Sequence, residues 1–286
     1  NLKKKKINVD LFINWWENQT LDKAYNYALS KFYPNTKSIG YIGFAPRNFD
    51  FHIFPTLYEV KHKIIPKKIA VIGSGYKELI KKFNKSLDVI SAPSFRFNHI
   101  YKYNNKYRKS KKKRILIGLP ILLSKSIELI RSLPKNIDLV FSDYEIEILI
   151  KPHPTISRDI IRKYINFNYY KNCFITTEDT YDILKKSDIL ISSMSSICME
   201  SIAMNIPCIV FDESIGLEYI PVPSNIDKSI WNLCKNNDEI LQSIEEFFTL
   251  DIEKQKKNYN ASLLVKQKYF KEVNKFNVKN FLGINN

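Results

Sequence analysis

Two apolar stretches of the chain end in side chains that can bind an anion. The first, residues 148–154 (ILIKPHP), ends with Lys151, His153 and Pro154. The second, residues 188–200 (DILISSMSSICME), carries a group of serines and ends with a glutamate: Ser193, Ser195, Ser196 and Glu200. Lysine and histidine donate hydrogen bonds to phosphates, and serine hydroxyls can do so beside the free N–H groups that begin a helix. The sequence therefore predicts a phosphate site, with Glu200 one helical turn further on and able to accept from ribose hydroxyls.

Each stretch has a simpler interpretation when it is taken alone. Serines before a helix are usually N-caps, and an isolated His-Pro pair is common. Taken together, the two stretches are stronger evidence for a binding site, because both end predicted strands. Ligands of open α/β sheets bind at the carboxyl ends of the strands. The sequence also lacks the loop GxxxxGK[ST] and, after its first strand, the loop GxGxxG. We therefore expect the two stretches to form one phosphate clamp.

The elements that must position this clamp alternate between strands and helices. In the first half we expect strands at 9–16, 38–44, 67–73 and 87–93, with helices at 20–32 and 75–84. In the second half strands are expected at 114–120, 146–154, 173–177, 188–193 and 207–212, separated by helices, and residues 227–247 and 253–282 read as helical. Such alternation predicts parallel sheets covered by helices. The expected organisation is an N-terminal domain over 1–96, a basic linker over 97–113, a nucleotide-binding domain over 114–226 and C-terminal helices over 227–286.

Charge is the main compositional signal. The 286 residues carry 45 Lys and Arg against 29 Asp and Glu, a formal net charge of +16, with basic runs at 3–6 and 106–114. These runs are either solvated segments or a patch that holds the protein on an anionic membrane. A nucleic-acid-binding protein is the alternative, but no recognition motif is present, so no specific nucleic acid is expected. The four cysteines lack CxxC spacing and no apolar run reaches a membrane span, which predicts a cytoplasmic protein, peripheral on the inner face of a bacterial inner membrane.

The motifs resemble those of a known family. KPHP (151–154) followed by the serine stretch is similar to the nucleotide-binding half of bacterial surface-polysaccharide transferases. The nearest pattern is that of GT-B enzymes using CMP-activated ulosonic acids: polysialyltransferases and Kdo transferases of capsule or lipopolysaccharide. CDP-glycerol polymerases of teichoic acid synthesis have a similar pattern. WWENQ (15–19), 39–55 and 91–97 resemble uncharacterised surface-carbohydrate biosynthesis proteins, so the likeness covers most of residues 10–215.

The resemblance implies a fold and a set of contacts. It implies two Rossmann-like domains whose parallel sheets face each other across a cleft, closed by C-terminal helices. Four strands are few for the first domain, which is either reduced or preceded by strands before Asn1. The resemblance also implies that His153, Pro154, Ser195 and Ser196 contact the CMP phosphate and cytidine. The expected partners are a nucleotide sugar and a glycan or glycolipid acceptor.

The first domain should supply the groups that act on the acceptor. Glu17 and Asp50 follow the carboxyl ends of predicted strands, so either could be a general base in an inverting enzyme or a nucleophile in a retaining one. The sequence leaves this choice open. His52 is a further candidate, and Arg47 and Arg96 could pair with the carboxylate of an acidic sugar or acceptor. No DxD pair is present, so we expect neither a metal nor any other cofactor.

Overall fold

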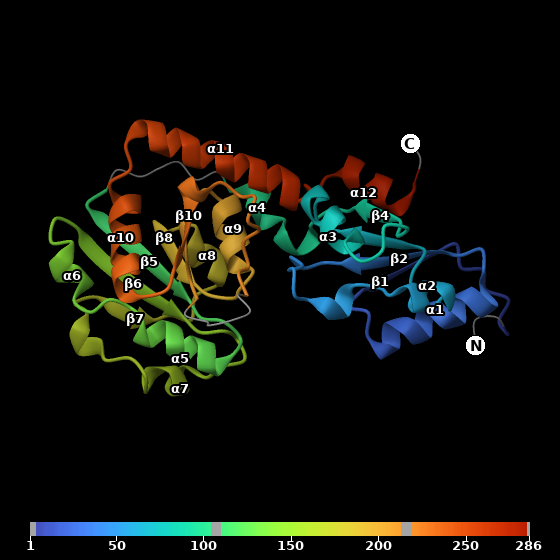
Figure 1. The fold of residues 1–286 in the computed structure, drawn as a ribbon, viewed down its shortest axis with the longest axis horizontal. Coiled ribbons are helices and arrows are strands. Elements are labelled where there is room, and N and C mark those ends of the chain that lie inside the picture. The colour runs from blue at the N-terminus through green and yellow to red at the C-terminus, as the bar shows by residue number, and fades with distance from the viewer. Residues whose placement is uncertain (1–3, 104–109, 213–218, 285–286) are drawn as a thin grey trace. The chain divides into compact units, whose positions relative to one another are not determined.

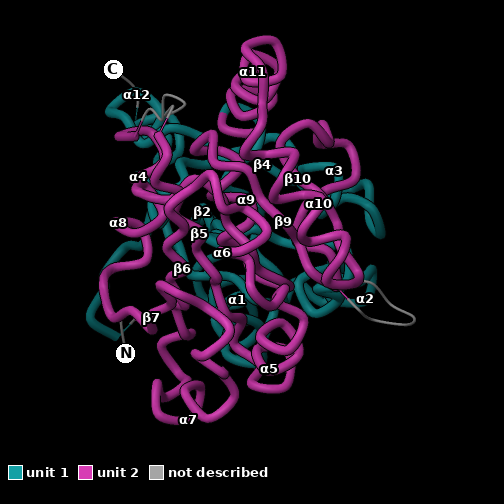
Figure 2. Tube along the Cα trace, turned by 90° about the vertical axis from the view of Figure 1, so that its left-hand side faces the viewer, with its two compact units in different colours: residues 1–98, 267–286 teal, residues 99–266 magenta. Residues whose placement is uncertain are grey.

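The computed structural model describes residues 4–103, 110–212 and 219–284. Two compact units make up the chain, shown as a ribbon in Figure 1 and in separate colours in Figure 2. Unit 1 contains residues 1–98 and 267–286, and unit 2 contains residues 99–266. The predicted C-terminal region 227–286 is therefore divided between the two units.

Unit 1 is built on a sheet of four parallel strands in the sequential order β1-β2-β3-β4. The strands are β1 (Leu11–Trp15), β2 (Lys37–Ile42), β3 (Lys68–Val71) and β4 (Val89–Ser91). The helices are α1 (Thr20–Phe32), α2 (Leu57–Lys61), α3 (Lys77–Lys81) and α12 (Lys275–Leu282), with 3-10 turns η1 (Phe51–Ile53), η2 (Ser74–Tyr76) and η3 (Phe95–Phe97). Phe281 of α12 packs against Tyr41 and Phe95, which ties the end of the chain to this sheet.

Unit 2 contains a parallel sheet of six strands in the order β10-β9-β8-β5-β6-β7. The strands are β5 (Lys112–Gly118), β6 (Glu145–Lys151), β7 (Cys173–Ile175), β8 (Ile189–Ser192), β9 (Cys208–Phe211) and β10 (Trp231–Cys234). The helices are α4 (His99–Lys102), α5 (Leu123–Arg131), α6 (Ile137–Val140), α7 (Arg158–Arg162), α8 (Thr180–Leu184), α9 (Ile197–Ala203), α10 (Asn237–Phe248) and α11 (Ile252–Tyr269), with 3-10 turns η4 (Phe167–Tyr169) and η5 (Lys228–Ile230). The boundary between the units falls within α11.

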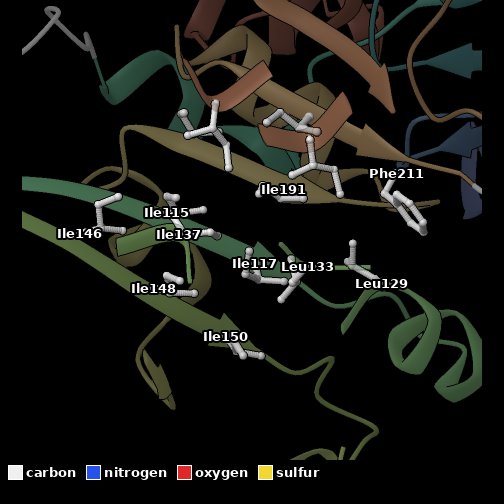
Figure 3. Packing of buried hydrophobic residues seen from close by; sticks show 14 of the residues in the cluster. Ile115, Ile117, Leu129, Leu133, Ile137, Ile146, Ile148, Ile150, Ile191 and Phe211 are labelled. Carbon is white, nitrogen blue, oxygen red and sulfur yellow. The ribbon is translucent and has the colours of Figure 1, made fainter. Parts of the chain in front are cut away.

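The central strands of unit 2 have apolar middle portions because both faces of the sheet are covered there. Side chains alternate between faces, so Ile115 and Ile117 of β5 point to one side and Leu116 to the other, and all three are buried. The first face packs against α5, α6 and α10 in one cluster, part of which is shown in Figure 3. This packing fixes the strand register, and with it the positions of the residues that follow each strand.

Two sequence expectations about elements were wrong in detail. Residues 227–247 were expected to be helical, but Trp231–Cys234 form β10 and pair in parallel with β9. The expected linker 97–113 contains α4 and the start of β5, while residues 104–109, with much of the basic run 106–114, lie outside the described residues. The four cysteines are free and buried. Among the described helices, none is both long enough and apolar enough to cross a bilayer.

Candidate phosphate site at the carboxyl edge of unit 2

The direction in which successive strands are added to the unit 2 sheet reverses between β5 and β8. From β5 the chain proceeds to β6 and β7 on one side, and it then crosses to β8, β9 and β10 on the other. The segments that leave β5 and β8 therefore diverge at their carboxyl ends, which is the place where doubly wound sheets bind ligands. Residues 119–122 after β5 and 193–196 after β8 flank this point. The predicted serine stretch lies there.

The serine turn is organised by the backbone between β8 and α9. Ser192 Oγ donates to the Gly118 carbonyl (2.6 Å), which ties the end of β8 to the end of β5. Ser193 is buried, and its Oγ has no hydrogen-bond partner in the part of the chain that the structure describes. Ser195 and Ser196 are partly exposed, and their carbonyls accept the first helical bonds, from Cys198 and Met199 N–H. Polar hydrogens are thus available for an anion at this turn.

Lys151 and His153 lie one strand further from the serine turn than expected. The sequence interpretation placed them on the strand next to the serine strand, but β5 separates β6 from β8. Gly118 of β5 is in register with Lys151 on one side and with Ser192 on the other. The backbones of Lys151 and Ser192 are therefore about 10 Å apart, two strand spacings, with a residue lacking a side chain between them.

The side chains of the KPHP turn are held in defined orientations. Lys151 Nζ donates to the Glu178 carbonyl (2.6 Å). His153 Nδ1 lies 2.8 Å from Thr155 Oγ1, and it accepts from Thr155 N–H at 3.3 Å. In the tautomer in which Nδ1 accepts the Thr155 N–H bond, the proton of the neutral ring lies on Nε2. Pro154 is exposed and follows this turn.

Glu200 is buried in α9 and faces a histidine that the sequence interpretation missed. Its Oε2 lies 3.2 Å from His99 Nε2, an ion-pair distance, although the two atoms are not aligned as a hydrogen bond. Its Oε1 accepts from Ser196 Oγ at 3.4 Å. The His99 ring stacks on Tyr181, with the ring centroids 3.7 Å apart. One carboxylate thus connects a predicted phosphate-binding serine to α4.

His99 was missed because it lies in a segment that was interpreted as an aperiodic linker. Its only sequence signal is a histidine directly before Ile100, which is fully buried. The segment 119–122 was missed for a different reason. Leu119–Pro120 was interpreted as the end of a strand, and which loops lie beside the serine turn depends on the strand order, which the sequence does not give. Neither position could be connected to the serine turn without the sheet topology.

The predicted acceptor-side residues lie in unit 1, in different settings. Glu17 follows β1 and is partly exposed, and its two oxygens accept from Trp15 Nε1 (2.8 Å) and Gln19 Nε2 (2.9 Å). Asp50 is buried, and it accepts from the Arg47 backbone N–H (2.9 Å) and pairs with the Arg47 guanidinium (3.2 Å). Arg47 is thus already engaged with a carboxylate. His52 and Arg96 are exposed.

No set of three or more His, Cys, Asp or Glu side chains that could hold a metal ion is found among the described residues. The described polar groups at the carboxyl edge of unit 2 include a lysine, an imidazole, serine hydroxyls and a buried glutamate. These groups can bind a phosphate through hydrogen bonds and positive charge.

Comparison with known proteins identifies the fold. No protein-family model and no curated protein sequence matches the chain. A structure provisionally assigned as UDP-N-acetylglucosamine 2-epimerase of Listeria monocytogenes has a TM-score of 0.65 at 12% identity, covering 98% of this chain and 74% of that one. S. aureus MnaA solved with UDP gives 0.58 at 14% identity, with 99% and 77% coverage. A glycosyltransferase of kitacinnamycin gives 0.55 at 10%, with 93% and 74% coverage. The chain therefore has a GT-B-like fold of two parallel α/β units with helices at its C-terminus.

Proposed function

We propose that the chain is a glycosyltransferase that moves a sugar from a nucleotide donor to a bacterial surface glycan such as capsule or lipopolysaccharide. The observation that carries the proposal is the position of the serine turn at the switch point of the unit 2 sheet, with the KPHP turn and His153 following the second strand along. A diphosphate or monophosphate bound there would receive hydrogen bonds from both turns. The GT-B-like fold supports this class, because its structural neighbours include proteins named for UDP and for glycosyl transfer.

The proposed donor is a CMP-activated ulosonic acid, a sugar of the sialic acid or Kdo type. Support for cytidine comes from the resemblance of KPHP and the serine stretch to the transferases that use such donors. Departure of CMP leaves negative charge on its phosphate, and donors that are already in place stabilise such charge without reorganisation. His153, Ser195 and Ser196 would serve this purpose, and Glu200 would accept from the ribose hydroxyls. The proposed reaction uses no metal.

A second candidate is a uridine-nucleotide sugar epimerase, which the highest TM-score quoted above favours. A third, suggested by the resemblance, is a transferase using a CDP-linked donor such as CDP-glycerol. A non-catalytic nucleotide-binding protein would bind the nucleotide without turnover. All of these place a nucleotide phosphate at the same turns, so the nucleotide and the product distinguish them.

A thermal-shift panel of CMP, CDP, UDP, GDP and ADP tests the assignment. A ligand at 100 times its dissociation constant stabilises the folded state by about 2.7 kcal/mol, which is readily detected. We expect the largest shift with CMP or CDP. A clear preference for UDP or GDP would overturn the donor assignment. Turnover of a UDP-sugar without an acceptor glycan would favour the epimerase, and binding of CMP without its release from any CMP-sugar and acceptor would favour the non-catalytic protein.

The acceptor side and the cellular location complete the proposal. We infer that Glu17 activates the acceptor hydroxyl, because its carboxylate is partly exposed and accepts from two neutral donors, Trp15 and Gln19, whereas Asp50 is buried against Arg47. His52 and Arg96 are exposed and could contact an acidic acceptor. The acceptor would be a glycan or glycolipid at the cytoplasmic face of the inner membrane, where the basic character of the chain favours anionic lipid.

A further inference from the structure

Unit 1 exposes a cluster of phenylalanine rings that we term the aromatic patch: Phe49, Phe51, Phe54 and Phe83. Adjacent ring centroids are 5.0–6.5 Å apart: 5.9 Å for Phe49–Phe51, 6.5 Å for Phe51–Phe54, 6.4 Å for Phe51–Phe83 and 5.0 Å for Phe54–Phe83. Phe54 is only 6% exposed and anchors the others, which are 36%, 59% and 55% exposed (Phe49, Phe51 and Phe83). The patch is thus a preformed group of rings, with one buried and three in contact with solvent.

Such a surface is unusual for a protein that only has to fold. Scattered exposed apolar residues are normal, but contiguous apolar patches mark binding surfaces. Two more large side chains in the same stretch are exposed, Leu57 (70%) and Tyr58 (67%) of α2. Phe51 lies in η1, directly after Asp50, whose pairing with Arg47 fixes the backbone of this turn. The exposed rings are therefore carried on an ordered loop.

Lysines predominate among the exposed charges of the two segments that carry the patch. Lys82 Nζ lies 5.8 Å from the Phe83 ring centroid, and Lys61, Lys63 and Lys85 are exposed in the same two segments, 44–66 and 79–86. The acidic residues of these segments are Asp50 and Glu59. Both are buried: Asp50 pairs with Arg47, and Glu59 pairs with Lys23 at 2.6 Å. The exposed charges within the two segments are therefore mostly lysines, and the exposed acidic residues Glu78 and Asp88 flank the second segment in sequence.

We propose that the aromatic patch and its lysines dock unit 1 on an anionic lipid bilayer, with the exposed phenylalanine rings inserted at the interface and the lysines against the headgroups. Aromatic rings and lysines together are the side chains that interfacial proteins use for this purpose. A second copy of the chain is a poorer partner, because a symmetric contact would place lysines against lysines. The proposal deepens the membrane location in the proposed function and rests on it, but it does not depend on the donor.

Flotation of the full chain with vesicles tests the docking surface. The probes are vesicles of phosphatidylcholine with 30% phosphatidylglycerol, and vesicles of phosphatidylcholine alone. We expect binding to the anionic vesicles, and a loss of at least about tenfold in the partition coefficient for the double variant Phe51→Ser and Phe83→Ser, since two half-exposed rings leave the interface. The variant Lys82→Gln and Lys85→Gln retains every ring and should weaken binding about fivefold for each lysine.

The matched control removes the same residue types elsewhere in unit 1. Phe276 is 65% exposed on α12 next to the exposed Lys275, and Figure 1 shows α12 and α2 on opposite sides of the unit 1 strands. Phe276→Ser with Lys275→Gln should leave vesicle binding within about twofold, in the range of ordinary surface substitutions. Circular dichroism of each variant shows whether it is folded.

The possible outcomes separate this proposal from the proposed function. Loss of vesicle binding in both patch variants, with the nucleotide thermal shift intact, supports the docking surface. Three results overturn it: no binding of the native chain to anionic vesicles, equal loss in the control, or binding that depends on salt and lysines but survives removal of the rings. The last would mean attraction by the basic runs alone. A missing nucleotide shift with intact, ring-dependent vesicle binding would instead count against the proposed function only.

Discussion

His99 Nε2 and Glu200 Oε2 are 3.2 Å apart in unit 2, and they join α4 to the first turns of α9. The glutamate is buried, and its other oxygen contacts Ser196 of the serine turn. A buried carboxylate is stable only with partners that replace its lost hydration. His99 therefore helps to fix the position of Glu200 and, through it, of the hydroxyl of Ser196.

Replacing His99 by alanine should destabilise unit 2 by about 1–3 kcal/mol, because it removes a partner of a buried carboxylate. Urea denaturation measures the change in the free energy of unfolding. A double-mutant cycle with Glu200→Gln isolates the pair: in the His99→Ala background the second substitution should cost less than it does alone. Costs that simply add would show that the two side chains are not coupled, and that the 3.2 Å contact has no energetic role.

The tautomer of His153 leads to a graded prediction for nucleotide binding. His153→Ala should remove most of the nucleotide-induced thermal shift, since it deletes the Nε2–H donor. Thr155→Val retains the backbone N–H that donates to Nδ1 and loses only the hydroxyl contact, so the affinity should fall by a smaller factor of about two to ten. His62→Ala, at the exposed histidine that follows α2 in unit 1, is the matched control. An unchanged shift in His153→Ala would remove this residue from the donor site.

Phosphate binding by side chains alone predicts insensitivity to chelators. In the proposed clamp, Lys151, His153 and the serine turn would provide charge and hydrogen bonds to the departing nucleotide, so that step would require no divalent ion. Initial rates of CMP release from a CMP-activated sugar should therefore be equal, within error, in 5 mM EDTA (about five times a typical metal supplement) and in Mg²⁺. Loss of activity in EDTA that Mg²⁺ restores would mean that the proposed clamp is incomplete.

The sequence was sufficient to predict two parallel α/β sheets, because alternation of apolar strands and amphipathic helices is a local signal. Strand order is not local. Nothing in residues 146–154 or 188–193 indicates that β5 lies between them, since the order depends on which side of the sheet each crossover packs. The error at β10 has a similar origin: Trp231–Cys234 is a short strand flanked by charged segments, and it is stabilised by pairing with β9.

The candidate site was predictable to the same extent. The serine turn and the KPHP turn reached the carboxyl edge of the sheet as expected, because every parallel strand ends there. Contacts between distant segments, such as His99 with Glu200, required the fold. The pairing of Arg47 with Asp50 was available from the sequence, since an arginine and an aspartate three residues apart in a turn readily meet. Because Asp50 is already paired with Arg47, Glu17 is the residue proposed as the base.

Glu59 should give unit 1 a stability that depends on pH. Burial raises the pKa of this carboxyl, but hydrogen bonds from Lys23 and Thr56 and the Lys23 charge outweigh it and hold the pKa below its ordinary 4.5. A group whose pKa is lower in the folded state stabilises that state above its unfolded pKa, and this stability is lost as the pH falls through the folded value. Glu59→Gln should therefore cost about 1–2 kcal/mol at pH 7, and the difference from the native chain should vanish in acid.

Denaturant titrations at pH 7, 5, 4 and 3 measure this difference. The gap between native chain and Glu59→Gln should be constant from pH 7 to 5 and should shrink below 4.5. Glu78→Gln is the control, because Glu78 is exposed. A gap that stays constant to pH 3 would mean that the loss comes from packing and not from the carboxylate charge.

The two candidate bases of unit 1 should respond differently to loss of charge. Glu17→Gln retains the shape and size of the side chain, but the amide cannot take up a proton. The turnover number should therefore fall by a factor of about 10²–10⁴, with little change in the KM for the donor. Asp50→Asn removes the buried partner of Arg47, so its main effect should be a loss of about 1–3 kcal/mol of stability. Release of CMP at saturating donor measures the first effect, and urea denaturation measures the second. A folded Asp50→Asn variant without turnover, beside an active Glu17→Gln variant, would exchange the two assignments.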